Sequence, residues 1–390
     1  MPKPIVALVG RPNVGKSTLF NRLVGERLAI VHDTPGTTRD RLFGEAEWNG
    51  RAFHIVDTGG IDPTHGGKTP LSVGSADFID EIKQQAKVAI DEADVVLFVN
   101  DGETGVTSAD LEVADILRRS QKKLPDGTFW PPIFVVANKT ESSERRDAAP
   151  QFYELGLGDP YPVSAVHGTG TGDLLDALVA SFPEQTEEEE DESIKIAIVG
   201  KPNAGKSSLL NKLVGEERAI VSPIPGTTRD ATDTKIEFNG LPITLIDTAG
   251  IRKRGKIERG VEQFSVLRSF KAIERADVAL LMIDATTGIT SQDAHIAGFI
   301  LDEWKSCVVI VNKWDAVEKD STSMEEYTRK IRADLNFMDY VPLLFISAKT
   351  GQRVDQVLPM ALRVQEERLA RLTTSKINEV IHKAQDAHPH

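Results

Sequence analysis

The chain is poor in several residue types, and each shortage excludes a class of protein. Among its 390 residues there is one cysteine, Cys307, which lies in the apolar run CVVIV. Disulfide bonds within the chain are therefore excluded, and we expect Cys307 to be a buried apolar side chain rather than a reactive thiol. No apolar run approaches the roughly 18 residues that a membrane-spanning helix needs. The opening MPKPIVALVG lacks the pattern of a signal peptide, so we expect a cytoplasmic protein with no membrane partner.

Basic residues are also scarce. Lysine and arginine number 46 against 59 aspartate and glutamate residues, which gives a net charge of -13. This balance argues against a nucleic-acid surface that covers the whole chain, so we expect no DNA partner, and any RNA contact must use a local basic patch. The length itself favours two or three domains.

The pattern Gly-x-x-x-x-Gly-Lys-Ser is present twice, at residues 10–17 and 200–207. Each copy follows an apolar run and precedes a stretch with helical periodicity, which is the order strand, loop, helix. In such a loop the backbone N–H groups converge on the β-phosphate of a nucleotide, and the lysine, Lys16 or Lys206, reaches the β and γ oxygens. This context favours a phosphate-binding loop over a glycine-rich turn with an incidental lysine.

The duplication continues beyond the two loops. PGTTRD at 35–40 returns at 225–230, Asn-Gly at 49–50 returns at 239–240, and DTGG at 57–60 is answered by DTAG at 247–250. Asn-Gly between extended runs predicts an antiparallel hairpin. The remainder of each half alternates apolar strands with helical patterns, which predicts an α/β fold of two tandem P-loop domains, each a mostly parallel sheet with helices on both faces.

An acidic run separates the two copies. In EQTEEEEDE, residues 184–192, seven of nine residues are acidic, so the segment repels itself and is expected to be a solvated linker. A dedicated acidic docking segment is the alternative. The predicted organisation is a first G domain at 1–182, the linker at 183–192, a second G domain at 193–362, and the start of a further element at 363–390.

The DxxG motifs supply the next part of each predicted site. Asp57 and Asp247, at strand ends, are expected to hold Mg²⁺ through water, and the backbone N–H groups of Gly60 and Gly250 can meet the γ-phosphate.

A threonine of GTTRD is expected to complete the Mg²⁺ shell only when a γ-phosphate is present, which would make the segment a switch. Thr38 and Thr228 are the predicted ligands, and Thr37 and Thr227 are the neighbouring alternatives.

The choice of base is predicted from NKWD at 312–315. The carboxylate of Asp315 can accept hydrogen bonds from N1–H and the 2-amino group of guanine, which adenine cannot donate, and a site with unpaired polar groups rejects the wrong base. Lys313 is expected to lie along the base, Asn312 to brace the loop, and the backbone of Ala348 to meet the guanine O6.

The first copy differs at this point, because NKTE places Glu141 where aspartate is expected. The charge is retained, but the extra methylene displaces the carboxylate and adds rotamer entropy. We therefore predict that the first site prefers GTP with weaker discrimination than the second.

The residue after DxxG is isoleucine in both copies, Ile61 and Ile251, where small signalling GTPases have a glutamine that orients water. Another source of charge stabilisation is required. The side-chain oxygens of Asn13 and Asn203 could hold a monovalent cation against the phosphates, so we hypothesise that hydrolysis depends on K⁺.

The predicted site residues form matching sets in the two copies. The catalytic set is Lys16, Asn13, Thr38, Gly60, Lys206, Asn203, Thr228 and Gly250. The Mg²⁺ set is Ser17, Thr38, Asp57, Ser207, Thr228 and Asp247. The nucleotide set of the first copy is Gly10, Arg11, Pro12, Asn13, Val14, Gly15, Lys16, Ser17, Thr18, Asp57, Thr58, Gly59, Gly60, Ile61, Asn138, Lys139, Thr140, Glu141, Ser164 and Ala165. That of the second copy is Gly200, Lys201, Pro202, Asn203, Ala204, Gly205, Lys206, Ser207, Ser208, Asp247, Thr248, Ala249, Gly250, Ile251, Asn312, Lys313, Trp314, Asp315, Ser347, Ala348 and Lys349.

Over essentially its whole length the chain resembles the Der (EngA) family of bacterial GTPases. The resemblance lies in two sets of the motifs GxxxxGKS, TTRD, DxxG, NKxD or NKxE and Ser-Ala, in the acidic linker, and in the isoleucine after DxxG. The resemblance implies a cytoplasmic, K⁺-stimulated GTPase, expected as a monomer, that binds the ribosome and assists assembly of the large subunit. It also implies that LTTSKINEVI begins a KH-like α+β domain, and we expect either that the sequence is a fragment or that this domain is truncated. The remaining basic candidate for RNA contact is RKRGK, with Arg252, Lys253, Arg254 and Lys256.

Two other functions are alternatives. One is a nucleotide-gated RNA- or protein-binding module in which one G domain, the first with Glu141, is mainly a regulatory sensor. An ATP-dependent motor or transporter is disfavoured by NKWD and by the lack of membrane segments.

Overall fold

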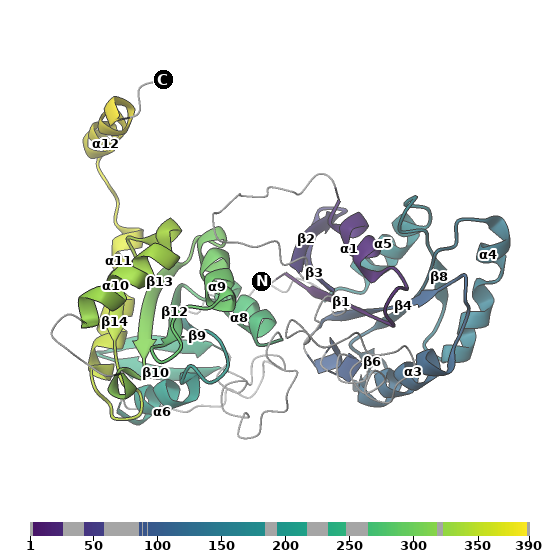
Figure 1. The fold of residues 1–390 in the computed structure, drawn as a ribbon, viewed down its shortest axis with the longest axis horizontal. Coiled ribbons are helices and arrows are strands. Elements are labelled where there is room, and N and C mark those ends of the chain that lie inside the picture. The colour runs from purple at the N-terminus through teal and green to yellow at the C-terminus, as the bar shows by residue number, and fades with distance from the viewer. Residues whose placement is uncertain are drawn as a thin grey trace. The chain divides into compact units, whose positions relative to one another are not determined.

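The computed structural model describes residues 3–25, 43–57, 86–87, 89–91, 93–183, 193–216, 233–246, 264–317 and 323–387 (Figure 1). The described residues divide into two compact units. The first holds those up to residue 183 together with 264–274, and the second holds 193–246 and 275–387. Residues 184–192 of the predicted linker lie outside the described residues, and the predicted domain boundaries remain a prediction.

The sheet of the first unit has the strand order β2-β3-β1-β4-β7-β8. β2 and β3 pair antiparallel, and the other neighbours pair parallel. A separate short hairpin joins β5 and β6. The strands are β1 (Ile5–Val9), β2 (Phe43–Trp48), β3 (Arg51–Asp57), β4 (Val95–Asp101), β5 (Lys122–Lys123), β6 (Phe129–Trp130), β7 (Ile133–Asn138) and β8 (Pro160–Pro162).

The sheet of the second unit repeats this topology in the order β10-β11-β9-β12-β13-β14, again with one antiparallel pair, β10 and β11, at the edge. The predicted fold class of two mostly parallel α/β domains is confirmed. The strands are β9 (Ile194–Val199), β10 (Thr234–Phe238), β11 (Leu241–Ile246), β12 (Val278–Asp284), β13 (Ser306–Asn312) and β14 (Leu343–Phe345).

Both predicted Asn-Gly hairpins are present. Asn49 and Gly50 have φ angles of 50° and 73°, and Asn239 and Gly240 have 50° and 79°. Two successive residues with positive φ match the right-handed twist of the flanking strands, which is why Asn-Gly is favoured there. The turns place the third strand of each copy, β3 or β11, directly beside the strand that leads into the phosphate loop.

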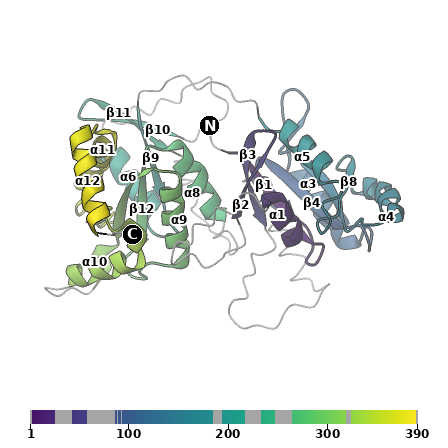
Figure 2. The same ribbon diagram turned by 90° about the horizontal axis from the view of Figure 1, so that it is seen from above.

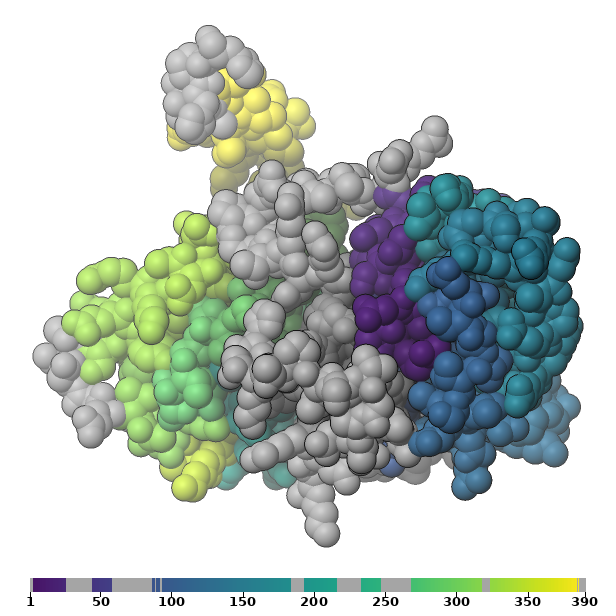
Figure 3. All heavy atoms as spheres, turned by 45° about the vertical axis from the view of Figure 1, so that its right-hand side comes forward, coloured from purple at the N-terminus to yellow at the C-terminus, as the bar shows by residue number. Residues whose placement is uncertain are grey.

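Helices cover both faces of each sheet, as Figures 1 and 2 show for α9 and α11 around β9 and β12. In the first unit, Leu19 of α1 and Leu174 of α5 pack on one face, whereas Leu117 of α3 and Phe152 pack on the other. On the face shown in Figure 3, the purple atoms of the N-terminal segment lie directly beside blue and teal atoms of later residues of the first unit. Besides residues 264–274 of α8 (Phe264–Arg275), the described helices of the first unit are α1 (Lys16–Val24), α3 (Ser108–Ser120), α4 (Ser143–Asp147), the 3-10 helix η2 (Ala149–Leu155) and α5 (Thr171–Ala180).

The second unit ends in two helices of 13 and 14 residues, α11 (Val357–Leu369) and α12 (Thr374–Ala387). Residues 366–383 are all exposed and α12 is a helix, but the KH-like identity of this element remains a prediction. Within the described residues no helix is both long and apolar enough to span a bilayer. The remaining helices are α6 (Lys206–Glu216), α9 (Ser291–Asp302), η3 (Trp314–Ala316), α10 (Ser323–Asp334), η4 (Asn336–Met338) and η5 (Val354–Gln356).

Candidate nucleotide-binding sites

The structure describes the phosphate loops and the base-side loops of both copies. The predicted residues outside the described part are Thr37, Thr38, Thr58, Gly59, Gly60, Ile61, Thr227, Thr228, Asp247, Thr248, Ala249, Gly250, Ile251, Arg252, Lys253, Arg254 and Lys256.

Each phosphate loop is closed against the loop that carries the NK motif. Gly15 and Gly205 have φ angles of 92° and 100°, and a Cβ atom on either would lie 2.3 Å from Nδ2 of Asn138 or 2.1 Å from Nδ2 of Asn312. Only glycine allows this approach, because any side chain would displace the asparagine. The next residue begins α1 or α6, so the first-turn N–H groups of each helix face the loop, where an anion is favoured.

The loop lysine of the first copy is buried beneath its own loop. Lys16 Nζ donates to the carbonyl oxygens of Gly10 and Arg11, both at 2.7 Å, and the side chain is largely buried. The pKa of Lys16 is lowered from its usual value to about 8, mainly by burial, while the charge of Asp57 opposes the shift and that of Arg11 adds to it. Two carbonyl oxygens thus hold the ammonium in place, and anionic phosphate oxygens are stronger partners for it.

A hydroxyl and a carboxylate meet where β3 ends. Ser17 Oγ donates to Oδ2 of Asp57 at 2.7 Å, and Asp57 is buried beside β1. The sequence places these residues 40 positions apart, and the parallel pairing of β1 with β3 brings them together.

Asn13 and Asn203 have the left-handed backbone conformation, with φ angles of 65° and 62°, and both are exposed. Asparagine tolerates this conformation better than most residues with a side chain. The backbone therefore supplies its own reason for asparagine here, separate from any cation.

On the base side, one asparagine joins two loops in each copy. Asn138 Nδ2 donates to the carbonyl oxygen of Val14 at 2.8 Å, and its Oδ1 accepts from the N–H of Ala165 at 3.0 Å. Asn312 repeats both contacts with Ala204 at 2.7 Å and Ala348 at 2.9 Å. The NK, Ser-Ala and phosphate loops therefore form one connected structure in each unit.

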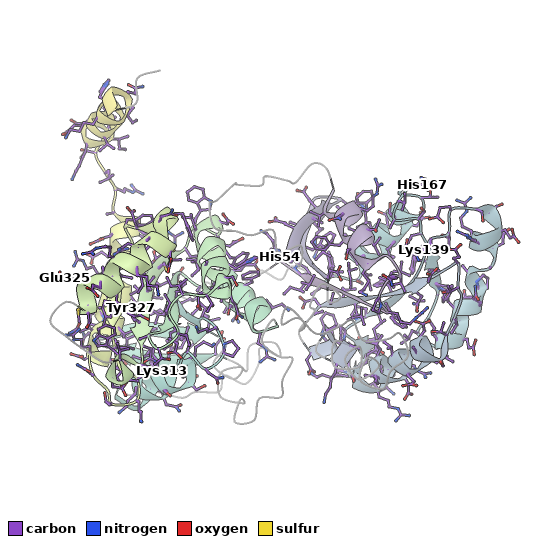
Figure 4. The ribbon with its side chains drawn as sticks, in the orientation of Figure 1. His54, Lys139, His167, Lys313, Glu325 and Tyr327 are labelled. Atoms are coloured by element: carbon purple, nitrogen blue, oxygen red, sulfur yellow. The ribbon has the colours of Figure 1, made fainter. Side chains whose placement is uncertain are left out.

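The lysine that follows this asparagine also repeats its contacts (Figure 4). Lys139 Nζ donates to Oδ2 of Asp101 at 2.7 Å, and Lys313 Nζ donates to Oδ2 of Asp284 at 2.6 Å. Burial tends to raise the pKa of Asp101, but hydrogen bonds from Lys139 and from backbone N–H groups outweigh it and lower the pKa. The pKa of Asp284 is lowered in the same way by Lys313 and Thr286.

The two copies differ in the residues around the predicted base-reading carboxylate. Glu141 accepts from Ser164 Oγ at 3.2 Å and pairs with Arg145 at 3.2 Å. Arg145 also pairs with Glu103 at 2.6 Å, so Glu141 competes for a shared guanidinium.

The second copy has aromatic packing instead. The Trp314 ring centroid lies 4.6 Å from that of Phe345 and 5.5 Å from that of Tyr327, which is labelled in Figure 4. At the position of Trp314 the first copy has Thr140, which donates to the carbonyl oxygen of Val163 at 2.9 Å. At this position the base-side loop therefore has a hydrogen-bonded polar side chain in the first unit and a packed aromatic one in the second.

Sequence reasoning missed Asp101, Asp284 and Arg145. The two aspartates end the repeated strands VVLFVND and VALLMID, so the duplication itself carried a signal for them. Arg145 has no counterpart motif, and no pattern pointed to it.

Comparison with known proteins identifies the chain as similar to GTPases. The family model described as "50S ribosome-binding GTPase" matches residues 5–139 and again 195–313. GTPase Der of Chloroflexus aggregans is 54% identical over 382 residues, which are 98% of this chain and 82% of that protein. GTPase Der of Herpetosiphon aurantiacus is 54% identical over 395 residues and is covered over 83% of its length, and GTPase Der of a Geobacillus species is 50% identical over 382 residues, again 83% of its length.

Fold, duplicated loops and these matches define the chain as a GTPase with two tandem G domains. It belongs to the GTPase Der family. As a member of that family it binds GTP and GDP and hydrolyses GTP.

Proposed function

We propose that both units bind and hydrolyse GTP, each through its own phosphate loop and base-side loops. The observation that carries this proposal is the matched pair of asparagine bridges, Asn138 to Val14 and Asn312 to Ala204. A duplicated motif could persist in sequence after one site had lost its function. The similar distances, 2.8 and 2.7 Å, support two loops that are both well formed.

The residues present fit a magnesium ion in the first unit. Ser17 Oγ and Asp57 Oδ2 are hard oxygen donors within 2.7 Å of each other, and Mg²⁺ prefers such ligands. We assign Ser17 as a direct ligand and Asp57 as a ligand through water, with Thr38 from the first switch, and Ser207, Asp247 and Thr228 correspondingly in the second unit. When bound, Mg²⁺ neutralises charge on the phosphate oxygens. The protein's own contribution is to hold the nucleotide, with Lys16 and the N-terminus of α1 facing its phosphates.

Potassium is the proposed source of additional charge stabilisation, held by Asn13 and Asn203. Because both residues have positive φ, an alanine variant would disturb the loop as well as remove the amide. Asn13→Gly combined with Asn203→Gly keeps the backbone conformation accessible and removes only the side chains. We expect the unmodified chain to hydrolyse GTP faster in K⁺ than in Na⁺ and the double glycine variant to lose this difference. Equal rates of the unmodified chain in the two salts contradict the proposal.

The proposed biological role is association of the monomeric protein with large ribosomal particles and assistance in their assembly in the cytoplasm. The family description and the basic residues Arg252, Lys253, Arg254 and Lys256, which follow the second DxxG motif, support this role. Sedimentation with large subunits in a non-hydrolysable GTP analogue and in GDP tests it. We expect more binding with the GTP analogue, and identical binding in both states contradicts a nucleotide-controlled association.

A second function, in which the first unit is mainly a sensor, is favoured by the contacts of Glu141 with Arg145 and Ser164. Lys16→Ala and Lys206→Ala separate the two possibilities. A sensor role predicts that Lys206→Ala removes most of the GTP turnover and Lys16→Ala changes mainly its control. Equal losses of turnover contradict it.

A further inference from the structure

The second residue of the phosphate loop differs between the copies, and its side chain has different partners in each. In the first copy Arg11 Nε donates to Oδ1 of Asp110 at 2.7 Å. Asp110 lies in the first turn of α3, and its side chain is fully buried. Its other oxygen, Oδ2, accepts from the N–H and the hydroxyl of Thr107, at 3.0 and 2.7 Å. Both carboxylate oxygens are therefore paired, and Arg11 ties the loop to the start of α3.

In the second copy the same carboxylate is only partly paired. Oδ2 of Asp293 accepts from the N–H and the hydroxyl of Thr290 at 3.0 and 2.7 Å, as in the first copy. Lys201 replaces arginine, and its Nζ donates to Thr287 Oγ1 at 2.6 Å and lies 3.6 Å from Oδ2 of Asp293. Within the described part of the chain, Oδ1 of this fully buried carboxylate has no hydrogen-bond partner.

The different partners follow from the chemistry of the two cations. The guanidinium of arginine is a planar group with several donors in fixed directions, whereas the ammonium of lysine is a compact charge that turns toward the nearest oxygens. Arg11 thus reaches the rigid first turn of α3. Lys201 instead contacts Thr287 and the carbonyl oxygen of Gly288, which belong to the connection between β12 and α9.

This residue also touches the loop lysine through its backbone. Lys16 Nζ binds the carbonyl oxygens of Gly10 and Arg11. Lys206 Nζ binds those of Gly200 and Lys201, at 2.5 and 2.6 Å. The loop lysine is therefore held by the same residue whose side chain is anchored outside the loop, on Asp110 of α3 in the first copy and mainly on the connection between β12 and α9 in the second. Among the described residues, Nη2 of Arg11 is buried without a hydrogen-bond partner, as is Oδ1 of Asp293.

We propose that the second residue of each phosphate loop, Arg11 or Lys201, positions the loop and thereby sets how long the site retains its nucleotide. Arg11, fixed by Asp110, restrains the first loop and slows release. Lys201 leaves Oδ1 of Asp293 unpaired and the second loop less restrained, so release from the second site is faster. This inference rests on the proposed function, since it takes the phosphates to lie within these loops.

Release of a fluorescent GDP from the full chain, followed by stopped flow, tests the proposal. The Lys16→Ala background isolates the second site, and the Lys206→Ala background isolates the first. In the former, Lys201→Arg is expected to slow release about five- to tenfold, because the new charge-assisted hydrogen bond pairs a buried oxygen. In the latter, Arg11→Lys is expected to speed release by a similar factor.

Two controls separate positioning from general stability. Adding Asp293→Asn to Lys201→Arg is expected to remove the slowing, and Lys383→Arg, on the exposed face of α12, is expected to leave release unchanged. If residue 201 affected only general stability, Lys201→Arg would not slow GDP release in a way that depends on the Asp293 carboxylate. If GDP binds normally but Lys201→Arg releases it at the parent rate, or if the slowing survives Asp293→Asn, the inference is overturned. If neither background binds GDP, the proposed function itself fails.

Discussion

Asn138 donates from its side-chain amide to the backbone carbonyl of Val14 at 2.8 Å, and this buried hydrogen bond joins the NK loop to the phosphate loop. The same amide accepts from Ala165 at 3.0 Å. The base end and the phosphate end of the site are therefore connected through one side chain.

Removal of this asparagine is expected to weaken nucleotide binding at its own site. Asn138→Ala leaves the Val14 carbonyl and the Ala165 N–H without their partner, and an unpaired buried polar group costs about 1–3 kcal/mol. We expect the affinity of the first site for GDP to fall by about tenfold or more, measured by calorimetry in the Lys206→Ala background. Asn138→Asp keeps the acceptor for Ala165 but sets a buried carboxylate oxygen against the Val14 carbonyl oxygen, so it is expected to lose at least as much affinity. Unchanged GDP affinity in Asn138→Ala would show that the bridge plays no part in binding.

Glu141 is expected to reduce guanine selectivity at the first site. Its carboxylate is engaged by Arg145 and Ser164, so guanine must compete with both for the same oxygens. Glu141→Asp in the Lys206→Ala background is expected to increase the preference for GDP over inosine diphosphate, which lacks the 2-amino group. Arg145→Gln, which removes the competing charge, is expected to act in the same direction. The prediction is wrong if the two isolated sites of the unmodified sequence already discriminate equally.

Nucleotide binding at the first site is expected to weaken as the pH rises through about 8. Burial lowers the pKa of Lys16 to about 8 before nucleotide binds, so the ammonium is present below this pH and is lost above it. Phosphate stabilises the ammonium, so binding takes up a proton in this range. GDP affinity measured between pH 7 and 9 in the Lys206→Ala background shows the effect. The Lys16→Arg variant keeps its charge over this range, so its pH profile shows only the titration of the nucleotide. If GDP affinity changes with pH in the same way in both chains, the pH dependence does not come from Lys16.

Cys307 is expected to report unfolding of the second unit. Its thiol is buried, as the sequence predicts, and burial raises its pKa to about 12 despite an opposing hydrogen bond from the backbone of Leu281. The thiolate is the reactive form, so at pH 8 a chromogenic disulfide should not react with the folded chain. One equivalent should react in denaturant. Rapid reaction of the native protein would contradict this burial.

Much of the architecture could be predicted from the sequence because its signals are local. Asn-Gly specifies a turn within two residues, and the phosphate loop places a glycine, a lysine and a helix start in one short segment. The side-chain partners could not be predicted in the same way. Arg11 meets Asp110 at 99 positions' separation, and Arg145 reaches Glu103 and Glu141 from a short helix that no motif marks. These partners depend on which side chains the completed fold brings together, which residue spacing along the chain does not determine.

The account depends most directly on the presence of two working nucleotide sites in one chain. Calorimetric titration of nucleotide-free protein with GDP and Mg²⁺ measures their number. We predict two equivalents of GDP per chain in the unmodified protein, and one equivalent in each of Lys16→Ala and Lys206→Ala. A single equivalent in the unmodified chain, abolished by one lysine variant and unaffected by the other, would contradict the account.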